Sequence, residues 1–434
     1  MRRVLGVAAF AALASLLTGE AVQGDLPTFL YTAAPRYDAG AWARGGERFP
    51  GGAHLVLVTR EGQRDVVTGF YASADAAVSY EGRHVLFAGR ATKQDRWQIW
   101  QADLSGGTPH QVVTTPADCI RPFYLPDGRV VYTRVTRAGS EIAVSSESGK
   151  TNVLTHVPGW YLTDDVLRDG RILFESRDEL FTVYPDGTSV ESLRCDHGPR
   201  RSGGRQVSSG DVIFTVDGGL ARYTSALAVQ QRLAASELEV AGPVAEVSAD
   251  RWLVAARSRS GGVYSIHEAG PHSCGLGSIA AARGTNAVEP VIVAARVRPR
   301  DFPSALVAAR KTGNLLCLNA SESMNPIEGK THAVRLYTRD AAGRPQVLGQ
   351  TVVASDGSFY VEVPADRPIR MELLDAAGGS LRAEQHWFWM RPSEQRICVG
   401  CHAGPERAPE NQVPEILNQI LKPVKMLGDY GRPQ

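Results

Sequence analysis

The residues with the clearest chemical pattern lie near the end of the chain, where Cys398, Val399, Gly400, Cys401 and His402 form one C-x-x-C-H motif. This spacing suits covalent haem attachment, because two thiols can reach the two vinyl groups of one porphyrin while the next imidazole comes under its iron. Cys398 and Cys401 are therefore expected to form thioethers to a single haem c, with His402 as the proximal iron ligand.

Other uses of the two cysteines fit the sequence less well. A structural zinc site needs a second pair of ligands at similar spacing, and a thioredoxin-like pair belongs to a βαβ unit, a pattern that the chain does not show. The remaining cysteines are isolated from one another: Cys119, Cys195, Cys274 and Cys317. In an oxidising compartment these four either form two disulfides, in any of three pairings, or stay as buried free thiols.

The sixth coordination position of the iron decides between electron transfer and ligand chemistry. A second strong ligand makes an electron carrier, whereas an open position permits binding or catalysis. His386, Met390 and Met426 lie near the motif in sequence. His386 is the first candidate and Met426 the second. The aromatic run of residues 387–389, which follows His386, packs either on a porphyrin face or in the core of its domain.

The N-terminal residues predict export. Two arginines precede an apolar stretch from about Val4 to Leu17, and small residues follow, so residues 1–24 read as a secretory signal peptide. No later segment approaches the roughly 20 apolar residues that a membrane-spanning helix needs. The mature protein is therefore expected to be soluble, in the periplasm or secreted.

The composition is that of an ordinary globular protein with two or three domains, since 43% of its 434 residues are hydrophobic and 21% are charged. Forty-seven basic and 46 acidic residues give a formal charge of +1. No global field would attract nucleic acid or an anionic membrane. The expected partner is a redox protein.

A repeated pattern of turn and short apolar strand runs from about Gly52 to Val293. A period of roughly 40 residues with several short strands per unit is typical of propeller blades. The glycines of the repeated turns are Gly82, Gly128, Gly170 and Gly210, and the strands expected to be innermost lie near Ala76, Ile120, Leu162, Gln206, Pro243 and Val288. This predicts six blades within residues 25–293, with five or seven as the alternatives. The strand at residues 54–60 is expected to complete the last sheet and close the ring.

The repeat stops after Val293, and residues 294–306 have the arginine and proline content of a linker. Residues 307–434 contain short alternating strands and turns, which predict a small β-sandwich carrying the haem segment. Only residues 411–427, which include Met426, have helical periodicity. The expected fold class is all-β, with a six-bladed propeller followed by a sandwich-like domain and a C-terminal c-type haem segment.

The blade segments, such as PDGRVVYTR at residues 126–134, resemble the TolB-like and PD40 families of periplasmic propeller repeats. The whole arrangement resembles exported proteins related to the alpha subunit of hydrazine synthase, most strongly from about Val291 to Pro409, where DGSFYVEVPA precedes CVGCH. The resemblance implies a six-bladed propeller joined to a haem domain like the C-terminal region of that subunit. It also implies haem attachment at Cys398 and Cys401 and ligation by His402.

The resemblance further implies an upstream haem that takes part in the chemistry of that multisubunit enzyme, but this chain has a single C-x-x-C-H motif. Hydrazine synthesis is therefore not expected. The expected function is that of a periplasmic monohaem c-type cytochrome that transfers electrons. The alternatives are a haem oxidoreductase acting on a small nitrogen compound, or a propeller binding module with a structural haem.

Overall fold

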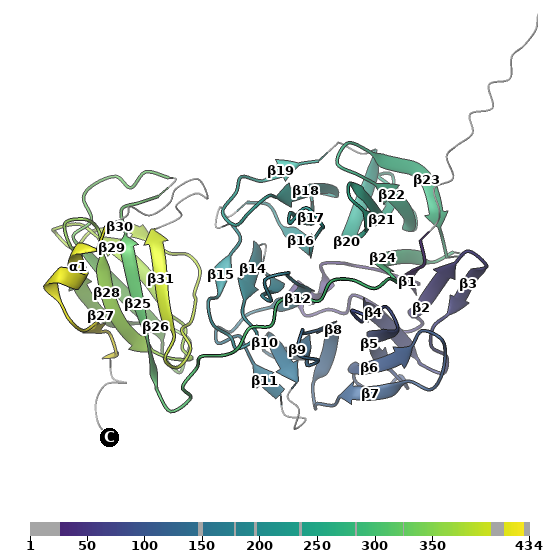
Figure 1. Ribbon diagram of the computed structural model, residues 1–434, viewed down its shortest axis with the longest axis horizontal. Helices are drawn as coiled ribbons and strands as arrows, with labels where there is room; N and C mark the ends of the chain where they lie inside the picture. Colours follow the sequence, from purple (N-terminus) through teal and green to yellow (C-terminus); the bar gives the residue numbers. More distant parts are fainter. Residues whose placement is uncertain are drawn as a thin grey trace, which may run out of the picture.

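The computed structural model describes residues 27–145, 151–177, 179–194, 198–233, 237–282, 284–323, 325–400 and 412–428. The predicted signal peptide lies outside these residues. Strands dominate and form eight four-stranded sheets. Six sheets surround a common axis, and two form a separate domain, which a linker connects to the propeller (Figure 1). The all-β fold class expected from the sequence is confirmed.

Five blades of the propeller are successive antiparallel meanders. The first is β4 (Ala72–Val78), β5 (His84–Arg90), β6 (Gln98–Asp103) and β7 (His110–Val113). The second is β8 (Asp118–Tyr124), β9 (Val130–Thr136), β10 (Gly139–Ser145) and β11 (Thr151–Val153). The third is β12 (Tyr161–Val166), β13 (Ile172–Ser176), β14 (Glu179–Val183) and β15 (Glu191–Ser192). The last two are β16 (Arg201–Gln206), β17 (Val212–Val216), β18 (Gly219–Tyr223) and β19 (Gln231–Arg232), then β20 (Leu238–Ser248), β21 (Arg251–Ser258), β22 (Ser265–Ala269) and β23 (Cys274–Ala280).

The sixth blade closes the ring with strands from both ends of the propeller. Its order is β24 (Asn286–Ile292), β1 (Phe29–Ala34), β2 (His54–Thr59) and β3 (Gly62–Asp65). The sequence predicted the strand that became β2 but missed β1, which pairs with both β2 and β24. All six residues of β1 are buried. A strand buried on both faces lacks the polar alternation by which a half-buried strand is recognised.

The first strand of each blade faces the propeller channel. Strands β4, β8, β12, β16, β20 and β24 contact one another in a ring that returns from β24 to β4, and they are the six strands expected from the sequence. Each contains an interruption of the pairing register, a β-bulge. The backbone φ is positive within five of these bulges, at Asp75, Arg121, Gly203, Gly242 and Glu289. A bulge redirects side chains locally, and here it turns them toward the channel.

The connection from β1 to β2, residues 35–53, crosses the propeller axis. It contains a short 3-10 helix, η1 (Ala41–Arg44). The Tyr37 hydroxyl donates to Glu289 Oε1 at 2.9 Å, and Arg48 pairs with Asp75 at 2.7 Å. Glu289 and Asp75 belong to neighbouring blades, whereas Trp42 of the same connection has the Arg200 guanidinium 5.6 Å from its ring centroid, and Arg200 precedes β16 on the opposite side of the ring. The connection therefore covers one mouth of the channel.

The second domain is a β-sandwich, as the sequence predicts. One sheet has the order β31 (Gln395–Gly400), β25 (Thr312–Asn319), β28 (Phe359–Pro364) and β32 (Val424–Lys425). The other has the order β27 (Pro345–Val352), β26 (Ala333–Arg339), β29 (Arg370–Leu374) and β30 (Ser380–Ala383). Apolar side chains of both sheets, among them Leu315, Leu336 and Phe359, form the core between them.

The helix predicted over residues 411–427 is wrong in extent, because α1 spans only Glu415–Gln419. Pro414 precedes it, Ile420 is already extended, and Pro423 follows. Proline lacks the N–H of a helical hydrogen bond and disfavours helical backbone in the residue before it. The apolar spacing of this segment therefore does not build a buried face, and Leu421 is 99% exposed.

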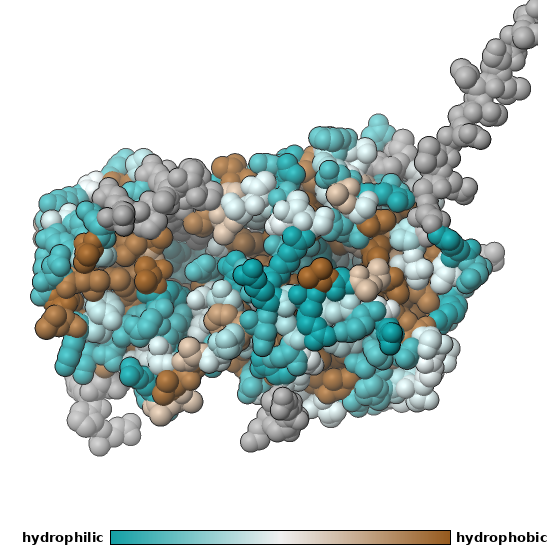
Figure 2. Space-filling view, in the orientation of Figure 1, coloured by the Kyte–Doolittle hydropathy of each residue, from teal (hydrophilic) through white to brown (hydrophobic). Residues whose placement is uncertain are grey.

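The linker of residues 294–306 lies along the propeller surface. The Arg296 guanidinium stacks over the ring of Tyr80 at 4.4 Å, and Phe302 stacks on Tyr184 with ring centroids 3.8 Å apart. The hydrophilic band across the middle of Figure 2 follows the course that the linker takes in Figure 1. The linker thus fixes the second domain beside the propeller. No helix among the described residues has the length and apolarity of a bilayer span.

Candidate functional site

A cavity of about 490 Å³ lies between the propeller and the second domain. The blade of β12 to β15 contributes Tyr161, Phe174 and Phe181 to its wall, and the second domain contributes Cys317, Phe359 and Trp387. A volume of this size with mainly aromatic and aliphatic walls is typical of a site for a small organic molecule. The cavity needs both domains, because neither supplies the whole wall.

Cys398 faces this cavity from β31. That strand runs parallel to β25, which places Cys398 opposite Cys317, and both residues line the cavity. Burial raises the pKa of the Cys398 thiol to about 11, so the thiol is protonated at neutral pH. Cys401 and His402 follow within two residues of the end of β31 but lie outside the described residues. The structure therefore places the first cysteine of the C-x-x-C-H motif at the cavity.

The structure separates the candidate distal ligands. His386 lines the cavity, and its ring meets Phe181 of the propeller edge-on with centroids 5.7 Å apart. Met390 and Met426 are buried in the core of the second domain and are not among the described residues that line the cavity. The cavity that Cys398 faces is thus lined by the first candidate and not by the second.

Trp387, Phe388 and Trp389 all line the cavity, but they differ in their surroundings. Trp389 is 2% exposed, belongs to the propeller core, and donates its indole N–H to the Gly187 carbonyl at 2.9 Å. Phe388 packs against the cores of both domains. Trp387 is half-buried, with the Arg339 guanidinium 4.7 Å from its ring centroid. The interpretation as core is confirmed only in part, because Trp389 lies in the core of the propeller rather than of its own domain and Phe388 contacts both cores. Packing on a porphyrin face stays a prediction.

Polar contacts hold the two domains together beside the cavity. Arg391 contacts His156 of the propeller, and the Ser189 N–H donates to Glu394 Oε1 at 3.0 Å. Glu394 also pairs with Arg396 at 2.8 Å. Burial, together with the charge of Arg391, lowers the pKa of His156 to about 3. The imidazole is therefore neutral and accepts a hydrogen bond from the guanidinium.

Two disulfides among the isolated cysteines, one of the two expected arrangements, are ruled out by Cys119. It is a free thiol in β8, buried in the propeller core and 3.2 Å from Thr115 Oγ1. Burial raises its pKa to about 11. The alternative of a buried thiol is correct for Cys119, while Cys195 lies outside the described residues.

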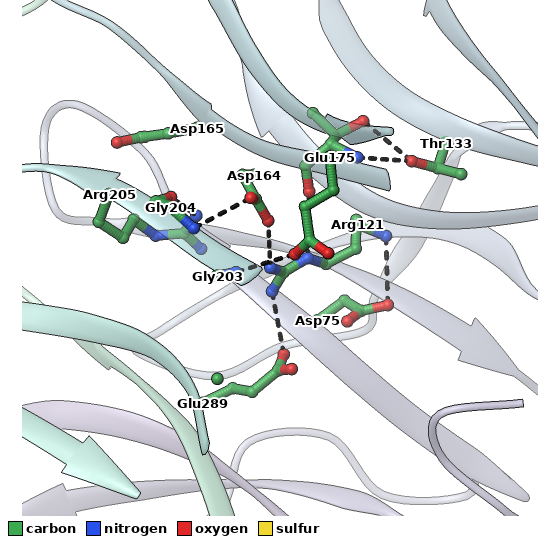
Figure 3. Close-up of polar contacts among 12 residues, drawn as sticks. Asp75, Arg121, Thr133, Asp164, Asp165, Glu175, Gly203, Gly204, Arg205 and Glu289 are labelled. Carbon is green, nitrogen blue, oxygen red and sulfur yellow. Dashed lines mark hydrogen bonds and ion pairs between the residues drawn. The ribbon is translucent and has the colours of Figure 1, made fainter. Parts of the chain in front are cut away.

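A second group of polar side chains, which was not recognised in the sequence, fills the propeller channel (Figure 3). Arg121 pairs with Asp164 at 2.9 Å and with Glu289 at 3.1 Å. Arg48 pairs with Asp75 and also contacts Glu289. All five side chains are almost completely buried. Their charges come from the bulges of four inner strands and from the 35–53 connection.

The channel perturbs its carboxyl groups in opposite directions. Burial would raise the pKa of Glu289, but Arg48 and Arg121 more than offset this and lower it to about 2. Burial raises the pKa of Glu175 to about 8, and the neighbouring Asp164 adds to the rise. One Glu175 oxygen accepts from the Gly203 N–H at 2.8 Å.

One sequence signal for this group is a charged residue inside an otherwise apolar inner strand, as at Arg121 and Glu289, each followed by proline. Among the described residues, no three His, Cys, Asp or Glu side chains are grouped so that they would hold a metal ion.

Comparison with known proteins identifies relatives of the second domain and of the overall fold. Residues 317–403, from β25 through the C-x-x-C-H motif, match the family model of the hydrazine synthase alpha subunit middle domain. The sequence had led us to liken this region to the C-terminal part of that subunit. Hydrazine synthase subunit alpha of Kuenenia stuttgartiensis is 39% identical over 61 residues, which are 14% of this chain and 8% of that protein.

The solved structure of Kuenenia stuttgartiensis hydrazine synthase superposes with a TM-score of 0.77 at 17% identity, covering 91% of this chain and 72% of the other. TolB from Acinetobacter baumannii is 16% identical, with a TM-score of 0.42 over 62% of this chain and 68% of the other. The chain is a β-propeller protein with an attached β-sandwich domain. It is related to the hydrazine synthase alpha subunit, by sequence over the second domain and by fold over most of its length.

Proposed function

We propose that the interdomain cavity holds one covalently attached haem c and that the protein is an exported monohaem cytochrome. The observation that carries this proposal is the position of Cys398. The first thiol of a C-x-x-C-H motif lines a cavity of about 490 Å³ with aromatic walls, and His386 lines the same cavity. The relation to the hydrazine synthase alpha subunit is a second reason, because that resemblance implies haem attachment at the same motif.

The residues around the cavity fit a porphyrin. Phe174, Phe181 and Trp387 provide flat apolar surfaces of the kind on which a porphyrin ring packs. Cys398 would hold one vinyl position, and Cys401 follows at the spacing for the second. When bound, haem supplies an iron whose axial ligands set its redox potential and reactivity.

In this proposal the iron ligands are two imidazoles, that of His402 in the motif and that of His386, which lines the cavity. Ligation by two strong ligands favours electron transfer over substrate chemistry. Electron transfer to a redox partner protein in the periplasm is therefore the function that we put first. Methionine ligation by Met426 is not favoured, since its side chain lies in the core of the second domain.

The test is a haem stain of the denatured full-length protein, made in a host that matures c-type cytochromes, followed by its visible spectrum. We expect covalent haem and a low-spin spectrum that carbon monoxide leaves unchanged. His386→Ala should give a high-spin form that binds carbon monoxide, whereas His54→Ala, at an exposed histidine of the propeller, should behave as the parent. A mature chain without the mass of haem would refute the proposal.

A second candidate function is oxidation or reduction of a small nitrogen compound at an open iron. The relationship to the hydrazine synthase alpha subunit favours it. In that case the unaltered protein is high-spin and binds nitric oxide or carbon monoxide, and His386→Ala changes neither property. Turnover of such a compound that is lost in His402→Ala would establish this function over simple electron transfer.

A further inference from the structure

We propose that Arg177 of the propeller and Arg339 of the second domain bind the two carboxylates of the ligand in the interdomain cavity, so that the site selects an apolar ring bearing anionic side chains. This inference rests on the proposed function, in which the ring is haem and the carboxylates are its propionates. It assigns a role to residues from both domains.

The two arginines approach the cavity from opposite domains. Arg177 follows β13 directly and has a positive φ of 55°, while Arg339 is the last residue of β26. Both line the cavity. Both also act on the same hydroxyl: burial raises the pKa of Tyr161 above its usual range, and the charges of Arg177 and Arg339 oppose that rise. Both charges therefore act on one residue of the cavity wall, Tyr161.

Neither arginine has an ion-pair partner among the residues that the structure describes. The Arg339 Nε is buried and has no hydrogen-bond acceptor, although its guanidinium stacks over Trp387. Arg396, the third arginine of the wall, is different because it pairs with Glu394 and donates to the Trp389 carbonyl. Arg177 and Arg339 therefore bring to the cavity wall positive charge that no described ion pair offsets, and this favours an anionic ligand.

The acidic residues that line the cavity do not pair with these two arginines. Glu384 Oε1 accepts the backbone N–H groups of Gln385 and His386. The Glu191 carboxylate lies 4.0 Å from Arg171 on the same blade. Each carboxylate thus has donors of its own, and the cavity keeps two guanidinium groups that no described acidic residue neutralises.

The chemistry of the wall matches one class of ligand. Guanidinium groups bind carboxylates through two parallel hydrogen bonds, which are stronger than neutral ones. The aromatic walls bind a flat apolar ring. Arg177 is solvent-exposed and Arg339 half-buried, which suits carboxylates near the rim of the cavity and a ring inside it. A neutral ring would leave both guanidinium groups without a counter-ion.

The test uses the full-length chain with Cys398→Ser and Cys401→Ser, in which a ring binds reversibly. Haem and haem dimethyl ester, whose carboxylates are blocked, are titrated by absorbance. We expect haem to bind at least tenfold more tightly than the ester. Adding Arg177→Met and Arg339→Met should bring the two affinities together, mainly by weakening haem. Arg335→Met is the matched control on the same strand, since Arg335 pairs with Glu372 at 3.4 Å outside the cavity wall and should leave the ratio unchanged.

The outcomes separate this inference from the proposed function. Equal affinity of the serine variant for haem and for its ester overturns the role of the arginines but leaves haem binding intact. Failure of that variant to bind either ring, together with no covalent haem in the unaltered chain, overturns the proposed function itself. The ratio measured without arginine substitutions decides the question even if the methionine variants fail to fold.

Discussion

Replacing Glu175 with glutamine tests whether the propeller channel holds a protonated carboxyl group. Glu175 is 2% exposed, with one oxygen accepting from the Gly203 N–H and the other 3.6 Å from Arg200. Burial and the neighbouring Asp164 raise its pKa to about 8, and Arg200 only partly opposes this. The variant Glu175→Gln keeps an oxygen for Gly203 and cannot ionise.

The size and sign of the effect follow from proton linkage. Because the pKa of Glu175 is raised, the folded chain holds this proton more tightly than the unfolded chain. The resulting stability is complete below the ordinary pKa of 4.5 and is lost as the pH rises through about 8. From pH 5 up to the folded-state pKa of about 8 is roughly three pH units, over which the free energy of unfolding falls by about 4 kcal/mol. The glutamine variant lacks this loss.

The measurement is urea denaturation of the parent and of Glu175→Gln across that pH range. The variant should gain about 4 kcal/mol over the parent on going from pH 5 to pH 9, because every other titrating group is common to both proteins. Glu61→Gln, at an exposed glutamate between β2 and β3, should give a pH profile parallel to that of the parent. A parallel profile for Glu175→Gln would refute a protonated Glu175.

Two further substitutions test the domain contact and the channel. Trp389→Ala should lower the free energy of unfolding by about 3–5 kcal/mol, and Trp389→Phe, which loses the hydrogen bond to Gly187, by about 1 kcal/mol; denaturant melts measure both. Glu289→Gln should cost about 3–5 kcal/mol, since Arg48 and Arg121 lose a buried anion. The pKa of Glu289 is lowered to about 2, so the stability that its charge gives is complete above pH 4.5 and is lost toward pH 2. The difference in unfolding free energy between the parent and Glu289→Gln should therefore shrink when the melts are repeated in acid.

Most of the fold could be read from repetition in the sequence. Turn glycines such as Gly128 and Gly170 recur because four successive blades join their first two strands by the same kind of turn, and the six inner strands lie where this period places them. The missed strand, β1, has no such turn before it and is buried on both faces. The helix predicted over residues 411–427 was too long because its apolar spacing ignored two prolines. Pro414 and Pro423 confine the helical backbone to the residues between them.

The candidate site was only partly predictable. The spacing of Cys398 and Cys401 is local chemistry, which a sequence displays directly. The cavity wall is not local, because His386 meets Phe181 across a domain boundary that no sequence pattern describes. The channel network was missed for the same reason. Each inner strand contributes one charged or glycine bulge, and only closure of the ring brings Arg121 and Glu289 together.

The closing sheet sets an order of events for the newly made chain. Phe29 pairs opposite Ile292, so nearly the entire propeller must emerge before its two ends can meet. Pairings between residues so distant in sequence form slowly. The linker begins directly after β24, and the second domain packs against the blade of β12 to β15. A substitution that delays closure of the ring should therefore also delay formation of the interdomain cavity, even when the substituted residue lies far from Cys398.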